Sequence, residues 1–173
     1  MAVQFNVATL LKEPLGSTRE YAIEGRVLID DQPRHGEVRG RATFLRTSDG
    51  VLVTAELRGE ERDACSRCLT EVAIPLALTF EEVYLGGINP GSKLAASERE
   101  GFRIDEKHIL DMEEAIRQAW TVALPMQPLC RAECRGLCAR CGHDLNEGAC
   151  PCPPDVDERW SALQQLASQM EGT

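Results

Sequence analysis

The residues with the clearest chemical potential are eight cysteines, which fall into four close pairs. In chain order the pairs are Cys65 with Cys68, Cys130 with Cys134, Cys138 with Cys141, and Cys150 with Cys152. A structural zinc ion takes four thiolate ligands in a closed tetrahedron. Two pairs supply one such ligand set, so the four pairs predict two zinc sites and leave no cysteine over.

The four pairs can be combined into two sites in three ways. Only eight residues, 142–149, separate the third pair from the fourth, and a short loop closes at the smallest entropic cost. We therefore predict that the third and fourth pairs share one ion, which leaves the first and second pairs to hold the other. The rival partition joins the second pair to the third and lets the first pair reach the fourth.

Other uses of cysteine stay open. Cysteines can be small buried apolar residues, can form disulfides outside reducing compartments, or can hold an iron–sulfur cluster. A redox CxxC pair works from a helix N-terminus, whereas Cys65 and Cys68 precede a strand-like pattern. His143, in the loop between the third and fourth pairs, is a competing ligand. Two complete all-cysteine sets nevertheless favour metal binding without it.

Composition limits the classes of function. The net charge is −9, and proteins that bind nucleic acid through bulk charge are basic, so any RNA contact must be local or made through a partner. Residues 1–15 lack a basic start followed by an apolar block, and no apolar run approaches the roughly 20 residues of a membrane helix. We therefore expect a cytoplasmic protein without a membrane anchor.

The elements that must position the cysteines are mainly strands. Alternating apolar residues predict a hairpin across about 37–62, turned at Asp49-Gly50, and a half-buried strand over 71–81. Weaker strands are expected near 3–10 and 19–29. Pro75 lacks an amide hydrogen, so the strand that contains it should be an edge strand or bulged.

A helix is predicted over about 109–124. Apolar residues recur there at helical spacing, Asp111 with Glu114 fits a capping box, and Pro125 ends the element. Gly- and Pro-rich residues 86–101 should form a loop before it. The expected fold is α+β: an antiparallel β-barrel or curved sheet with one packed helix. This unit should span residues 1–125, followed by a zinc-ribbon-like Cys-rich segment over 126–154 and a tail helix within 155–173.

The Cys-rich segment has five prolines over 125–154 and few large apolar residues, so it has almost no core of its own. Binding at a structural zinc site contributes about 10–16 kcal/mol to folding, because the site does not exist in the unfolded chain. We predict that this segment is disordered without metal.

The order of these motifs resembles the YceD family of large ribosomal RNA subunit accumulation proteins. The resemblance covers about residues 3–153. It is carried by Cys65-Ser-Arg-Cys68-Leu69 before an alternating strand, by Ala123-Leu124-Pro125-Met126 and Pro128-Leu129-Cys130 after an acidic helix, and by the stretch from Gly136 to Asn146 with Cys150-Pro151-Cys152. It implies a role in the synthesis, processing or stability of large-subunit ribosomal RNA, and hence in ribosome biogenesis.

Two hypotheses for function follow, and neither is enzymatic, since four protein thiolates at each ion leave no open coordination position. The first is a factor that contacts ribosomal RNA or a pre-ribosomal particle. Residues 34–67 are not acidic like the rest of the chain, because they contain seven arginines against six acidic residues. The candidate RNA contacts in this stretch are Arg39, Arg41, Arg46, Arg58, Arg62 and Arg67. A solvated strand face is the competing interpretation of these arginines.

The second hypothesis is a zinc-ribbon adapter for a basic protein partner, such as a ribosomal protein or an RNA-processing enzyme, which the acidic net charge favours. A thiol redox protein is a third, weaker alternative.

Overall fold

The computed structural model describes residues 3–29, 34–86, 101–153 and 159. One sheet has the strand order β2-β3-β4-β5-β6, and a second, two-stranded sheet pairs β1 with β7. The strands are β1 (Gln4–Asn6), β2 (Thr18–Leu28), β3 (His35–Arg46), β4 (Gly50–Ala64), β5 (Glu71–Leu85), β6 (Phe102–Arg103) and β7 (Ile109–Asp111). A 3-10 turn (Leu10–Lys12) follows β1, and the helix α1 spans Glu113–Ala123. The loop and tail helix expected over most of 86–101 and 155–173 lie outside the described residues.

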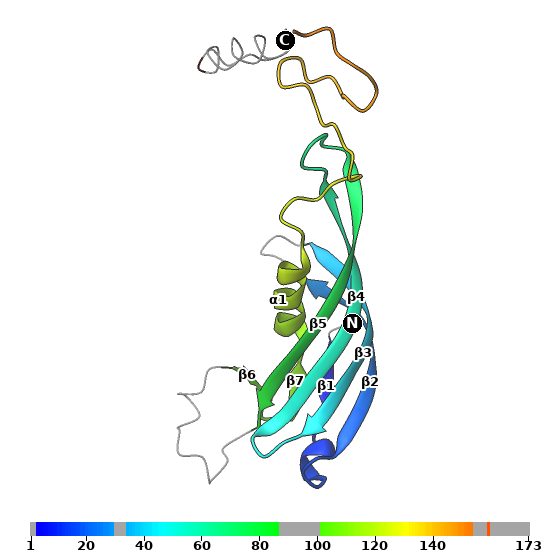
Figure 1. Cartoon of the computed structure of the whole chain (residues 1–173). Helices are drawn as coiled ribbons and strands as arrows, with labels where there is room; N and C mark the ends of the chain where they lie inside the picture. Colours follow the sequence, from blue (N-terminus) through cyan, green and yellow to red (C-terminus); the bar gives the residue numbers. More distant parts are fainter. Residues whose placement is uncertain (1–2, 30–33, 87–100, 154–158, 160–173) are drawn as a thin grey trace, which may run out of the picture.

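The main sheet is built from long antiparallel neighbours. The predicted hairpin exists as β3 and β4, and its turn is closed by the amide of Thr47, which donates to the carbonyl of Gly50 at 3.0 Å. β4 also pairs with β5 along 15 positions, from Gly50 opposite Leu85 to Ala64 opposite Glu71. Because β3 pairs with β4 only as far as Arg58, the remainder of β4 and β5 projects beyond the sheet as a two-stranded ribbon (Figure 1).

The sheet is curved and open, so the barrel alternative was wrong while the curved sheet with one helix is confirmed. β2 and β6 end the strand order on either side, and β6 joins β5 in parallel through only two residue pairs. α1 covers one face of this sheet, and β1 and β7 form a separate two-stranded sheet (Figure 1). Among the described residues, therefore, no strand joins the β2 edge to the β6 edge. Pro75 lies on the stretch of β5 that β6 does not pair with, as expected for an edge position.

The helix begins at Glu113, four residues later than its periodicity predicts. Ile109 continues the apolar stripe, but together with Leu110 it pairs with β1 as part of β7. The predicted capping box is also wrong: Asp111 accepts a hydrogen bond from the amide of Glu113 at 2.9 Å, while Glu114 pairs with Arg117. The helix ends before Pro125 as predicted, with Leu124 in an extended conformation.

α1 is held to the sheet by Trp120, which is fully buried. Its indole ring lies against Gly36 of β3 and Gly59 of β4, where a Cβ atom would collide with the ring. The indole N–H donates to Glu61 Oε2 at 3.0 Å. The two glycines on neighbouring strands thus leave the space that the indole ring fills. This packing fixes the position of the C-terminal end of α1 on the sheet.

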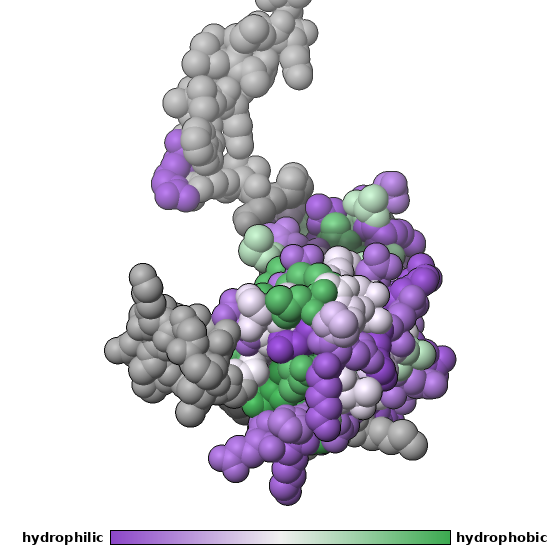
Figure 2. Space-filling view, turned by 90° about the horizontal axis from the view of Figure 1, so that it is seen from below, coloured by the Kyte–Doolittle hydropathy of each residue, from purple (hydrophilic) through white to green (hydrophobic). Residues whose placement is uncertain are grey.

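The other face of the sheet is solvated. Outward residues of β2 to β5 are mostly Arg, Glu and Thr, and inward residues such as Val38, Phe44 and Val53 form the core. Seen along the long axis, hydrophilic residues make up most of the rim and hydrophobic ones gather near the middle (Figure 2). No helix in the part of the chain that the structure describes is long and apolar enough to cross a membrane.

Candidate metal centres

The eight cysteines gather into two groups of four thiols. Within each group all four sulfur atoms lie within 4.8 Å of one another. We call the first the proximal group (Cys65, Cys68, Cys130 and Cys134) and the second the distal group (Cys138, Cys141, Cys150 and Cys152). This is the partition that the short loop between the third and fourth pairs favours, and the rival partition is not formed.

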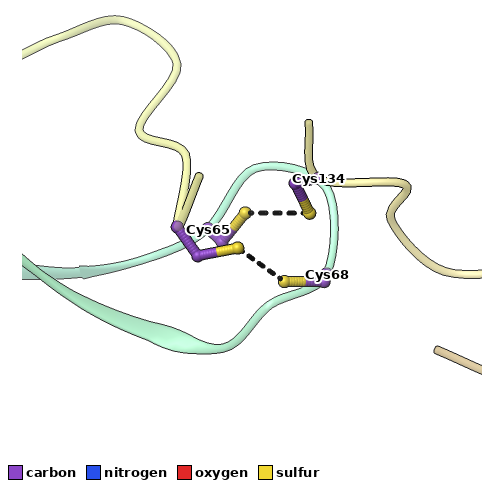
Figure 3. A group of neighbouring side chains, drawn as sticks. Cys65, Cys68 and Cys134 are labelled. Atoms are coloured by element: carbon purple, nitrogen blue, oxygen red, sulfur yellow. Dashed lines mark hydrogen bonds between the residues drawn. The ribbon is translucent and has the colours of Figure 1, made fainter. Parts of the chain in front are cut away.

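The proximal group lies at the tip of the ribbon formed by β4 and β5. Cys65 and Cys68 sit on the loop between these strands, while Cys134 comes from the chain that returns after α1 (Figure 3). Contacts between sulfur atoms therefore span 62 residues for Cys68 with Cys130 and 69 for Cys65 with Cys134. The group joins the strand domain to the Cys-rich segment, as the sequence predicts.

The sulfur positions fit a tetrahedral ion. The Sγ–Sγ separation is 3.6 Å between Cys68 and Cys130 and 3.9 Å between Cys65 and Cys134. A zinc–sulfur bond of about 2.3 Å gives a tetrahedron whose edge is about 3.8 Å. A disulfide would bring two sulfurs to about 2.05 Å. The proximal thiols are thus spaced as ligands around one ion, and all eight cysteines are free.

Both CxxC pairs form the same tight turn. The residue after the second cysteine has a left-handed backbone, with φ of +62° at Leu69 and +73° at Gly142. Its amide donates back to the carbonyl of the first cysteine, at 2.9 Å for Leu69 to Cys65 and for Gly142 to Cys138. This geometry turns the intervening amides toward the first sulfur.

These amides lower the pKa of one thiol in each group. Backbone N–H groups, led by that of Cys68, hold the pKa of the Cys65 thiol at about 6. The amides of Cys141 and Arg140 lower the pKa of Cys138 to about 6. Each group therefore contains at least one thiolate that is ready to bind a cation at neutral pH.

At least one further thiol in each group keeps its proton at neutral pH. Cys130 is exposed as a residue, but its sulfur faces the other three, and loss of water raises its pKa to about 12. Hydrogen bonding with Cys141 raises the pKa of Cys152 to about 12. Binding a dication would replace these protons, since the thiolate is the ligand form.

Main-chain hydrogen bonds hold the proximal group in place. The amide of Ser66 donates to the carbonyl of Pro128 at 2.8 Å, and that of Cys65 to the carbonyl of Thr70 at 2.8 Å. The Arg67 guanidinium donates to the carbonyl of Cys134 at 2.8 Å. Cys65, Cys68 and Cys134 are buried, and the apolar side chains packed around them are Val72, Leu129 and Leu137.

The distal group is more open, with Cys141 exposed and its other three members half-buried. His143 is exposed and belongs to neither group; its carbonyl accepts the amide of Cys138 at 2.8 Å. The side chain of Asn146 contacts Cys134 of the proximal group, a role that the sequence did not reveal.

The structure separates the six candidate RNA-contacting arginines. Arg39, Arg41 and Arg58 line one shallow depression of about 830 Å³ on the solvated face of the sheet. Arg62 is exposed on that face and pairs with Glu60 and Glu71. The remaining two arginines serve the fold.

Arg46 donates to the carbonyls of Thr47 and Gly50 in the turn between β3 and β4. Arg67 bonds within the proximal group, as described above. Neither joins the depression, so the candidates form no single surface.

Comparisons with known proteins point to one family. The family model described as "Large ribosomal RNA subunit accumulation protein YceD" matches residues 53–167. Uncharacterized proteins of Mycobacterium bovis and Mycobacterium tuberculosis are 29% identical over 119 residues, which cover 69% of this chain and 56% of theirs. One of Mycobacterium leprae is 31% identical over 119 residues, covering 69% of this chain and 54% of its own.

The chain thus spans little more than half the length of these relatives. No solved structure matches it. The matched range includes all eight cysteines, both strands of the projecting ribbon from Val53 onward, and α1. The chain belongs to the YceD family of large ribosomal RNA subunit accumulation proteins.

Proposed function

We propose that this protein is a non-enzymatic, cytoplasmic, zinc-binding factor that supports the accumulation of large-subunit ribosomal RNA and hence ribosome biogenesis. The observation that carries the ribosomal role is family membership over residues 53–167. The spacing of eight free thiols as ligands supports the metal, and cysteines kept as thiols fit a reducing compartment.

Zinc is the ion that best suits the donor set. Four thiolates at tetrahedral spacing are typical of structural zinc, whose filled d shell imposes no other geometry on its ligands. Each cysteine group would fill all four positions around its ion, which leaves none for a water or a substrate. This supports a structural ion at each group and argues against catalysis there.

Metal analysis of the reduced, native protein tests this part of the proposal. We expect two zinc ions per chain, and one after the double substitution Cys65→Ser with Cys68→Ser. Two ions remaining in that variant would refute the role of the first pair. Proteolysis after zinc chelation should cut within 126–153 while the sheet stays resistant; a segment that remains protected would contradict a metal-dependent fold.

The depression on the solvated face is the surface that we propose for RNA contact. Arg39 lies directly opposite Arg58 on the neighbouring strand, and like charges in that position repel each other unless an anion lies between them. Arg58 has no ion-pair partner among the described residues. Arg39 and Arg41 pair with Glu24 and Glu20 at 3.5 and 3.7 Å.

Exposed ion pairs of this kind contribute about 0–1 kcal/mol, so a phosphate can replace them. Three glutamates also line the depression, at positions 37, 56 and 60. We therefore expect contact that is weak, local and sensitive to salt.

Crosslinking to RNA in cells tests this surface. The double variant Arg39→Gln with Arg58→Gln should reduce crosslinked large-subunit RNA. The matched control is Arg103→Gln with Arg117→Gln, which changes the net charge equally at arginines that line a different part of the surface. Equal crosslinking by both variants would exclude this surface.

The second candidate function is an adapter that binds a basic protein, which the net charge of −9 favours. A pull-down with and without nuclease separates the two. A partner that survives nuclease supports the adapter, and loss of every partner supports contact through RNA.

A further inference from the structure

A side chain from one cysteine group reaches a sulfur of the other. Asn146 lies in the loop 142–149, which the distal group closes at both ends. Its Nδ2 atom lies 3.5 Å from Sγ of Cys134 in the proximal group and donates to it. This N–H···S contact connects the two groups through a single side chain.

The orientation of the Asn146 amide is fixed from several directions. Its Oδ1 accepts the backbone amide of Arg135 at 2.9 Å, so its Nδ2 must face the sulfur. Asp144 Oδ1 accepts both the Nδ2 and the backbone amide of Asn146, at 2.6 and 2.8 Å. The amide is half-buried and points a donor at Cys134.

The surrounding main chain continues this link. The amide of Leu145 donates to the carbonyl of Gly136 at 2.9 Å, and the backbones of Leu137 and Asp144 form an isolated antiparallel β-bridge. Leu137 also donates its amide to the carbonyl of Arg67 at 3.1 Å. Hydrogen bonds therefore run without a break from the loop of the first CxxC pair to the loop of the distal group.

We propose that Asn146 is a positioning residue that couples metal binding at the two groups. When the distal ion closes the loop, the loop presents Asn146 to Cys134, and the N–H donor stabilises that sulfur as a thiolate ligand. By thermodynamic reciprocity, the proximal ion strengthens binding of the distal ion by the same factor. The inference rests on the metal occupancy proposed above.

The magnitude follows from the behaviour of groups that hydrogen-bond metal ligands. Removing such a partner weakens metal affinity by roughly 10- to 100-fold. We expect a loss in this range for the proximal ion when the Asn146 donor is removed.

Asn146→Asp is the sharpest variant. It keeps an oxygen that can accept the Arg135 amide, but it loses the donor and places a carboxylate beside both the sulfur and the carboxylate of Asp144. Glu147→Gln is the control, since it changes an exposed neighbour that contributes only its backbone amide to the network. Chelator competition on the full chain gives a dissociation constant for each zinc ion, and circular dichroism checks the sheet.

Asn146→Asp should weaken the proximal ion roughly 10- to 100-fold, and Glu147→Gln should leave it unchanged. The ions are assigned with a variant that lacks the distal pair Cys150 and Cys152. Removing that pair should weaken the proximal ion in the wild-type background but not in Asn146→Ala, because the coupling residue is already gone.

Two results overturn the coupling: an unchanged proximal constant in Asn146→Asp, or the same effect of removing the distal pair in both backgrounds. In either case the wild type still binds two ions, so the metal proposal survives. A wild type that binds no metal overturns both proposals.

Discussion

Replacing Gly36 by alanine should destabilise the protein through a collision with Trp120. A Cβ atom at this position would lie 2.5 Å from Cη2 and 2.8 Å from Cζ3 of the indole, and 2.9 Å from Cδ1 of Ile29. The indole cannot swing away freely, since it is fully buried and its N–H is bonded to Glu61.

Overpacking of this kind costs about 1–3 kcal/mol. Alanine in a strand recovers about 0.5–1 kcal/mol relative to glycine, because it loses less backbone entropy on folding. The difference is a net loss of about 0–2.5 kcal/mol in the free energy of unfolding. Because the Cβ atom would lie as close as 2.5 Å to the buried ring, we expect the upper part of this range, about 1–2 kcal/mol, which lowers Tm by about 2–8 °C for a chain of this size.

Thermal and urea unfolding followed by circular dichroism, at constant metal concentration, measure this loss. Gly86→Ala is the matched control, because its Cβ would approach no atom closer than 3.7 Å. In a Trp120→Phe background, which lacks the far ring atoms, Gly36→Ala should become neutral or stabilising. An unchanged or raised Tm for Gly36→Ala, or the same loss in both backgrounds, would refute the packing argument.

Two further predictions concern the metal groups. Zinc binding at about pH 7 should release protons, because the pKa values of Cys130 and Cys152 are raised to about 12 and these thiols are still protonated. Cys65 and Cys138, with pKa values lowered to about 6, are already thiolates at pH 7 and release no proton on binding. Below about pH 6 they are protonated too, so zinc affinity should fall more steeply with falling pH there. An indicator dye in weak buffer measures the number of protons released. Leu69→Gly should preserve or strengthen zinc binding at the proximal group by relieving a left-handed backbone that costs a non-glycine residue about 1–2 kcal/mol. Gly142→Ala should weaken binding at the distal group for the same reason, and chelator competition that shows the opposite signs would contradict this account.

The cysteine partition could be predicted because it depends on local spacing. A CxxC pair forms a tight turn by itself, and the loop of eight residues between Cys141 and Cys150 closes at little entropic cost. The same local logic predicted the β3–β4 hairpin and the end of the helix before Pro125. These features need no knowledge of distant partners.

The errors arise where distant pairing decides the outcome. Ile109 fits the apolar stripe of the helix, yet it pairs with β1, together with Leu110, as part of β7. A curved sheet closes into a barrel only if its two edge strands pair with each other. Among the strands that the structure describes they do not pair, and α1 packs against one face of the sheet. The pattern of apolar residues along each strand does not show this arrangement. Gly36 and Gly59 could have signalled a close approach, because glycine inside a strand often marks one.

The candidate arginines show the same limit. All six lie in a stretch of balanced charge, so composition treats them alike. Only the register places Arg39 opposite Arg58, and only the fold uses Arg46 and Arg67 to donate to carbonyl groups. A surface formed by neighbouring strands cannot be derived from a pattern along one strand.

The ribbon formed by β4 and β5 explains why the proximal group is where it is. Beyond Arg58 the two strands have only each other as partners among the described residues, and an isolated two-stranded hairpin is marginally stable. The ribbon is held at its base by Trp120, through Gly59 and Glu61, and at its tip by four thiols, two of them from the chain that leaves the same helix. An ion at the tip would therefore fix both the ribbon and the chain that follows α1, and it would anchor the start of the segment that carries the distal group.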